Sequence, residues 1–155
     1  MKEIEVDVYR DSGVVEVKEL EFFEHQIGYK LPHEYKNLIS KHNALRPKND
    51  CFDFQFNSKT DSRDISFYGY GKEISSNVNI VKNQQEKDQY YHDHIVIIGE
   101  SANGDYICFD YRNNPLTDDP PVVLMLHDYP DANNKMLICH VADNFEQFVD
   151  SLYND

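Results

Sequence analysis

Four short, almost continuous apolar runs dominate the second half of the chain, at residues 95–98, 106–109, 122–126 and 136–139. Runs of this length between turn signals are typical of strands that are covered on both faces. Asn103-Gly104, between the first two runs, favours a tight hairpin. Loops rich in Asp, Asn and Pro separate the others. The chain is therefore expected to build its core around an antiparallel sheet.

Helical patterns flank these runs. Two helices are predicted near the N-terminus, over residues 18–27 and from Pro32 onward, and one is predicted at the C-terminus. Gly28 suits the C-terminal cap of the first helix, and Asp143 with Glu146 forms a capping-box-like pair that opens the last. The apolar residues that recur at helical spacing are Leu20, Phe23 and Ile27, then Tyr35, Leu38 and Ile39, then Phe145, Phe148, Val149 and Leu152.

The order of these elements indicates the fold class. Helices come first, then strands, then one more helix, which favours α+β over alternating βαβ units. We predict a mostly antiparallel sheet of about five or six strands, packed against N-terminal helices and a C-terminal helix. No repeat, low-complexity segment or linker divides the chain, so residues 1–155 are expected to form a single domain. Residues 1–17, with alternating apolar and acidic positions at 4–8, are predicted to be an N-terminal strand or arm.

The middle of the chain gives weaker signals. Phenylalanines alternate with polar residues over 52–56, which predicts a strand. Residues 57–64 are polar and are expected to form a loop, whereas 65–70 read as another strand with an irregular end. A third helix of undetermined length is expected to follow a cap at Ser75 or Ser76.

The charge of the chain narrows the classes of partner. Asp and Glu number 28 against 15 Lys and Arg, so the formal net charge is −13. An acidic domain without a basic stripe is a poor candidate for direct nucleic-acid binding, and anionic membranes are disfavoured for the same reason. The charge favours steered association with a basic partner, although solubility alone explains it equally well.

The cysteines and the N-terminus indicate the compartment. Three widely spaced cysteines, without a CxxC pair, do not indicate a disulfide framework. The N-terminus lacks a basic segment followed by an apolar run, and no stretch approaches the length of a membrane span. We expect a cytoplasmic protein.

Catalytic and metal-binding patterns are weak. His92 and His94 would share one face of a strand and are weak candidates for zinc ligands, but no third ligand accompanies them. Cys108 and Cys139 lie inside predicted strands, where a thiol is usually a small hydrophobic group. Asp105 and Asp110 are five residues apart, on opposite faces of a strand. We therefore expect no enzyme activity, no resident metal and no cofactor.

Acidic residues in the late loops are better candidates for contact with a partner. They lie beside prolines and an aromatic residue, where a partner can be met without opening the core. A solvated charged surface explains each single residue equally well. The candidate partner-binding residues are Asp118, Asp119, Asp128, Tyr129, Asp131, Tyr70, Tyr90 and Tyr91.

Several segments, taken together and in order, resemble a known family. Residues 22–43 (FFEHQIGYKLPHEYKNLISKHN), 98–112 (IGESANGDYICFDYR), 120–124 (PPVVL) and 141–148 (VADNFEQF) resemble the SUKH superfamily, which includes the yeast cell-wall-synthesis regulator. Ala44 departs from the pattern, because the family usually has Gly after the Asn, and the arm at 1–17 lies outside it.

The resemblance implies helices packed on a mainly antiparallel sheet and a role in binding proteins. It implies an immunity protein that neutralises a cognate polymorphic toxin, and the charge suits a basic nuclease domain as the target. The alternative is a regulatory or scaffold domain in a signalling or cell-envelope pathway, as the yeast relative suggests. The oligomeric state stays open, because the extended arm at residues 4–8 could pair with another chain.

Overall fold

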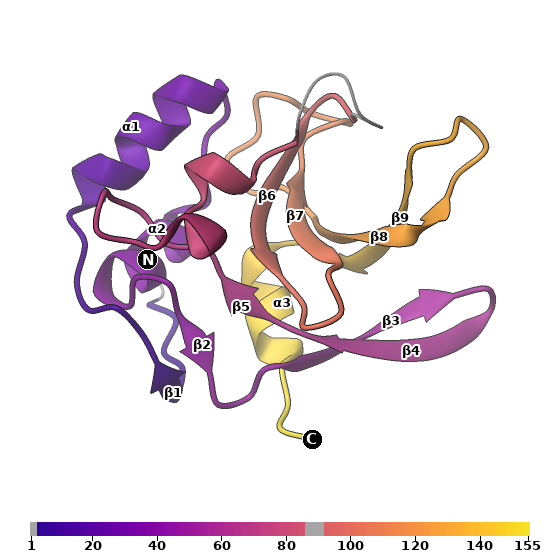
Figure 1. Cartoon of the computed structure of the whole chain (residues 1–155), viewed down its shortest axis with the longest axis horizontal. Helices are drawn as coiled ribbons and strands as arrows, with labels where there is room; N and C mark the ends of the chain where they lie inside the picture. The colour runs from indigo at the N-terminus through magenta and orange to yellow at the C-terminus, as the bar shows by residue number, and fades with distance from the viewer. Residues whose placement is uncertain (1–2, 86–91) are drawn as a thin grey trace.

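A five-stranded antiparallel sheet forms the centre of the computed structural model, which describes residues 3–85 and 92–155 (Figure 1). Its strand order is β5-β6-β7-β8-β9, so each strand pairs with its neighbour in sequence. The strands are β5 (Ser66–Phe67), β6 (Ile95–Glu100), β7 (Tyr106–Asp110), β8 (Val122–Pro130) and β9 (Met136–Ala142). The four apolar runs are the last four of these strands, which confirms the α+β prediction.

Two smaller antiparallel pairs lie beside the central sheet. β1 (Val8–Arg10) pairs with β2 (Arg46–Pro47), and β3 (Cys51–Phe56) pairs with β4 (Lys59–Asp64). β3 also lies against β9, and the long β3–β4 hairpin extends away from the helices, alongside β8 and β9 (Figure 1).

Three helices complete the fold: α1 (Val17–Ile27), α2 (His33–Lys41) and α3 (Phe145–Ser151). Gly28, with a φ of +80°, donates its N–H to the carbonyl of Glu24 and ends α1 as predicted. The cap of α3 differs by one residue from the prediction. Asn144 is the N-cap in place of Asp143, because its side chain accepts the N–H of Gln147.

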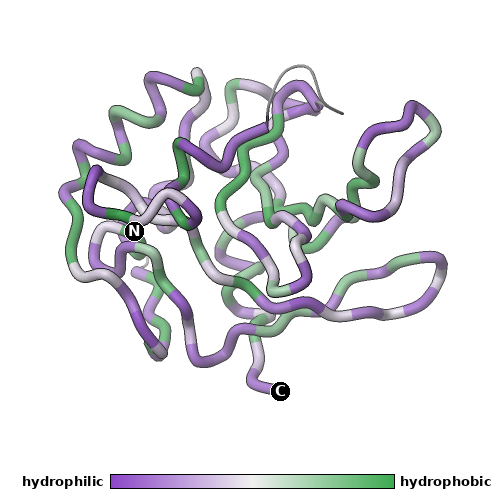
Figure 2. The backbone as a smooth tube through the Cα atoms, viewed as in Figure 1, coloured by the Kyte–Doolittle hydropathy of each residue, from purple (hydrophilic) through white to green (hydrophobic). Residues whose placement is uncertain are grey.

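An aromatic cluster joins the helices to the sheet. The ring of Tyr35 in α2 lies 5.1 Å from that of Phe109 in β7 and 5.4 Å from that of Phe145 in α3, both in edge-to-face geometry. All three side chains are fully buried. The hydropathy of the chain follows this arrangement, because the central strands are largely hydrophobic and their connecting loops largely hydrophilic (Figure 2).

Two predictions for the middle of the chain are wrong. Residues 59–64, expected in a loop, form β4, since their backbone pairs in register with β3 although the side chains are polar. The helix expected after Ser75 is replaced by two 3₁₀ turns, Ser76–Val78 and Val81–Asn83. The backbone between them is held by Gly69, which pairs with Asn79 and accepts the N–H of Ile80, so a continuous helix cannot form there.

Candidate protein-binding surface

The structure divides the predicted loop acids into two groups at opposite ends of β8. Asp118 and Asp119 lie in the loop before the strand. Asp128 and Tyr129 are among the last three residues of the strand, and Asp131 follows it. A nine-residue strand at roughly 3.3 Å per residue separates the two groups by on the order of 25 Å. The residues that the sequence analysis grouped together therefore belong to two separate acidic surfaces.

The first group is part of an acidic corner, which we define as Glu34, Asp118, Asp119 and Glu146. Burial and the neighbouring carboxylates of Glu34, Asp118 and Glu146 raise the pKa of Asp119. These groups come from α2, the β7–β8 loop and α3, which the aromatic cluster holds together. The corner thus gathers several acidic side chains, and within the described residues those of Glu34, Asp118 and Asp119 have no basic salt-bridge partner.

The second group forms the hairpin end, which we define as Asp128, Tyr129, Asp131 and Phe56. The rings of Tyr129 and Phe56 pack edge to face with their centres 4.8 Å apart, so the ends of two hairpins touch. Tyr129 nevertheless keeps 47% of its surface exposed. An exposed ring held against a second ring is a partly ordered anchor of the kind that interfaces favour.

The two carboxylates of the hairpin end differ. The backbone N–H groups of Lys135 and Asn133 donate to Asp131, which lowers its pKa and closes the turn between β8 and β9. Asp128 is exposed, and its carboxylate lies 3.1 Å from Nε2 of His127. Asp128 is therefore open to a partner, whereas Asp131 shapes the turn.

A buried carboxylate, which sequence reasoning did not connect with the surface, supports the hairpin end. Asp105, in the β6–β7 turn, accepts bonds from Arg63 Nε at 2.8 Å and from the backbone N–H of His127 at 3.0 Å. Nδ1 of His127 lies 2.5 Å from the same carboxylate. Because Arg63 is 42 residues and His127 22 residues from Asp105, no local pattern reveals this contact. Asp110 is separate, as predicted, and pairs with Arg112.

The tyrosine predictions need correction. Tyr70 is buried, and its hydroxyl lies 2.9 Å from that of Tyr35 inside the core, so it is not an exposed anchor. The strand expected over 65–70 ends at Phe67, and the segment after it turns inward because the Asn43 side chain bonds both backbone groups of Tyr70. Tyr90 and Tyr91 lie outside the described residues.

His92 and His94 lie in the turn before β6 and not in a strand, and they contact different elements. Nε2 of His92 is 2.7 Å from the carbonyl of Met136, whereas Nδ1 of His94 is 2.5 Å from the hydroxyl of Tyr29. Within residues 3–85 and 92–155, no three His, Cys, Asp or Glu side chains are placed to hold a metal ion. Cys108 is fully buried, and burial raises the pKa of its thiol well above its usual value.

Together, the fold and these surfaces define an acidic α+β domain in which the predicted loop acids lie at the two ends of one strand. The chain belongs to the SMI1 / KNR4 family (SUKH-1), which it matches over residues 15–151. This confirms the resemblance to the SUKH superfamily. The chain matches no curated protein and no solved structure. In the part of the chain that the structure describes, no helix is long and apolar enough to cross a membrane.

Proposed function

We propose that this chain is an immunity protein that binds a cognate toxin domain and neutralises it, and that the toxin domain is a basic nuclease. The acidic corner carries this proposal. Carboxylates from three elements lie near one another there, and burial together with the neighbouring charges of Glu34, Asp118 and Glu146 raises the pKa of Asp119. A cationic partner relieves that repulsion on binding, so the corner favours a basic surface over a neutral one.

The expected target follows from the chemistry of nucleases. An active site that holds phosphates is rich in cations, and a protein of net charge −13 is attracted to it over distances of about a Debye length. Membership of the SUKH-1 family supports the same class of function. The protein would act by covering the toxin in the cytoplasm.

We also propose that the protein has no catalytic activity. Its best-connected charged group, Asp105, is bonded to Arg63 and His127 and has only 2% of its surface exposed. These contacts join β4, the β6–β7 turn and β8, so Arg63, Asp105 and His127 serve to hold these elements together. Elemental analysis of the purified protein tests the weak zinc candidates His92 and His94, and bound zinc in stoichiometric amount would contradict this proposal.

Co-expression tests the function directly. The gene beside this one is expressed in a sensitive host with and without the chain, and we expect growth only when the chain is present. Asp118→Lys with Asp119→Lys should weaken protection, whereas Glu19→Lys with Glu21→Lys, on exposed positions of α1, should not. A neighbouring gene that encodes no toxin, together with no protection against candidate toxins, would rule the proposal out.

A regulatory or scaffold role is the second candidate, because the family is also that of SMI1 and KNR4. In that case the partner belongs to a signalling or cell-envelope pathway of the producing cell. Purification of the tagged chain from that cell separates the two functions. A stoichiometric endogenous partner that is not a toxin favours the second.

A further inference from the structure

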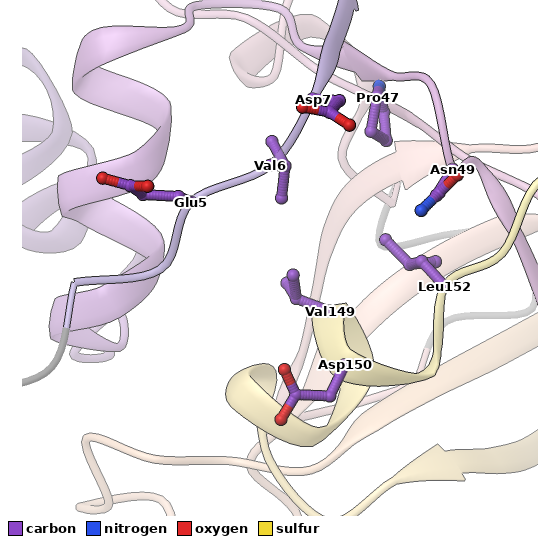
Figure 3. A pocket seen from close by; sticks show the side chains of 8 residues that line it. All are labelled: Glu5, Val6, Asp7, Pro47, Asn49, Val149, Asp150 and Leu152. Atoms are coloured by element: carbon purple, nitrogen blue, oxygen red, sulfur yellow. The ribbon is translucent and has the colours of Figure 1, made fainter.

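A groove separates the N-terminal arm from α3 and the C-terminal segment (Figure 3). It encloses about 400 Å³, within the range of about 300–1,000 Å³ that is typical of binding pockets. Val6 of the arm points across it toward Val149 and Leu152 (Figure 3). Pro47 also lines the groove, so its lining combines a few apolar side chains with a larger polar surface.

Three acidic residues also line the groove, and the side chain of Glu5 points away from Val149 and Leu152 (Figure 3). Glu5 and Asp7 flank Val6 on the arm, and Asp150 follows Val149 in α3 (Figure 3). All three residues are exposed, and within the described residues no hydrogen bond or salt bridge joins their carboxylates to another side chain. The groove therefore combines the apolar side chains of Val6, Val149 and Leu152 with the negative charge of these acids.

The backbone of the arm adds a third feature. The arm is extended, and its first strand pairing begins at Val8, opposite Pro47. The carbonyl of Asp7 accepts the N–H of Lys48, but in the described part of the chain the peptide groups of residues 4–6 make no backbone hydrogen bond. An extended segment with unpaired peptide groups is able to take up another strand.

The arm also lies outside the part of the chain that matches the family. The family match begins at residue 15, so the arm side of the groove lies outside it, whereas Val149 and Asp150 lie inside. A groove between a helix of the matched domain and a segment outside it can provide partner choice without change to the matched fold.

We propose that this groove docks an extended segment of the partner protein in which lysines or arginines alternate with aliphatic residues. Its aliphatic side chains contact Val6, Val149 and Leu152, its cations contact Glu5, Asp7 and Asp150, and its backbone pairs with the arm. This inference rests on the proposed function, because it names the kind of toxin surface that the chain recognises. A second copy of this chain is disfavoured as the occupant, because each copy carries a net charge of −13.

The test uses a defined probe, the capped peptide Lys-Val-Lys-Leu-Lys-Val, titrated into the full chain and followed by methyl NMR. We expect shifts concentrated at the methyl groups of Val6, Val149 and Leu152. The same peptide with Glu in place of Lys should not bind. Shifts spread over the acidic surface, no shifts, or equal binding of the Glu peptide would overturn the proposal.

Charge reversal provides the matched comparison. Glu5→Lys, Asp7→Lys and Asp150→Lys together add six charges, as do Glu19→Lys, Glu21→Lys and Glu73→Lys, so both variants go from −13 to −7. All six positions are exposed, so both variants should keep the Tm of the parent. We expect peptide affinity to fall roughly tenfold or more only in the groove variant. Equal losses would show that net charge alone attracts the peptide and would overturn the proposal.

The same two variants separate this inference from the proposed function. If the chain binds its toxin and both variants bind it equally well, the groove proposal fails and the function stands. If no toxin binds but the peptide seats at Val6, Val149 and Leu152, the function fails and the groove remains a docking site for another basic protein.

Discussion

Ala44 occupies a backbone conformation that favours glycine. Its φ is +52°, and the preceding Asn43 fixes the turn by bonding both backbone groups of Tyr70. Because Ala replaces the Gly of the family pattern, the sequence predicts a different turn here, and the structure places Ala44 in the left-handed conformation. A left-handed conformation costs a residue with a Cβ about 1–2 kcal/mol.

Replacement of Ala44 by Gly should therefore raise the free energy of unfolding by about 1 kcal/mol, the relief of backbone strain exceeding the added flexibility of the unfolded chain. Urea denaturation measures the change. The control is Ala132→Gly, at an exposed position without positive φ, which should lower stability by about 0.5–1 kcal/mol. Equal effects at both positions would contradict the role assigned to the conformation of Ala44.

Asp105 makes stability depend on acidity. Burial raises the pKa of its carboxyl, but the bonds from Arg63 and His127 outweigh burial, and the net effect lowers the pKa. A carboxyl whose pKa is lowered by folding stabilises the protein above its unfolded pKa of about 3.9, and this stabilisation is lost as pH falls through the folded value. The hairpin end should therefore loosen in acid.

Asp105→Asn tests this dependence. At neutral pH the variant should lose about 3 kcal/mol, because Arg63 and His127 lose a buried anionic partner. Between about pH 5 and pH 2 its stability should fall less steeply than that of the parent. Denaturation at each pH provides both measurements, with the exposed Asp93→Asn as control. Parallel curves for parent and Asp105→Asn would exclude Asp105 as a source of the pH dependence.

At the scale of elements, the start of α3 depends on one side chain. Asn144 accepts the N–H of Gln147 at 2.8 Å, and the Gln147 side chain in turn accepts the N–H of Asp143 at 3.4 Å. Asn144→Ala should lower the free energy of unfolding by about 1 kcal/mol, as the loss of an N-cap usually does. Asp143→Ala is the matched control, because its salt bridge with His140 is exposed and should contribute less than about 0.5 kcal/mol. If Asp143→Ala lowers the free energy of unfolding more than Asn144→Ala does, Asp143 and not Asn144 acts as the N-cap of α3.

The sequence predicted those elements whose own residues carry the signal. The apolar runs at 95–98, 106–109, 122–126 and 136–139 need burial wherever they lie, so their strands are evident before any partner is known. β4 has no apolar residue in its sequence KTDSRD, and it is a strand only because β3 pairs with it. The 3₁₀ turns likewise depend on contacts with Gly69, which is distant from local helical signals.

At the scale of the whole molecule, the candidate surface was predictable in composition but not in arrangement. Exposed acids in Pro-containing loops are a local property, and Asp118, Asp119 and Asp128 are indeed exposed. Their separation by the length of β8, the recruitment of Glu34 and Glu146 to the acidic corner, and the burial of Tyr70 all follow from tertiary packing. The groove between the N-terminal arm and α3 combines residues 147 positions apart, from Glu5 to Leu152, which only the fold brings together.

This arrangement predicts how a toxin should bind. Long-range attraction acts before contact, so a rise in salt from about 0.05 M to about 0.5 M should slow association by tenfold or more and change dissociation much less. Asp118→Asn with Asp119→Asn should reduce the salt dependence if the acidic corner faces the toxin, and Asp128→Asn should do so if the hairpin end faces it. Stopped-flow or surface-based kinetics against the toxin domain gives both rates.

Because the two surfaces lie at opposite ends of β8, the association rate of a compact toxin should depend strongly on only one of them. Association that is independent of salt would instead indicate an apolar interface, in which net charge serves only solubility.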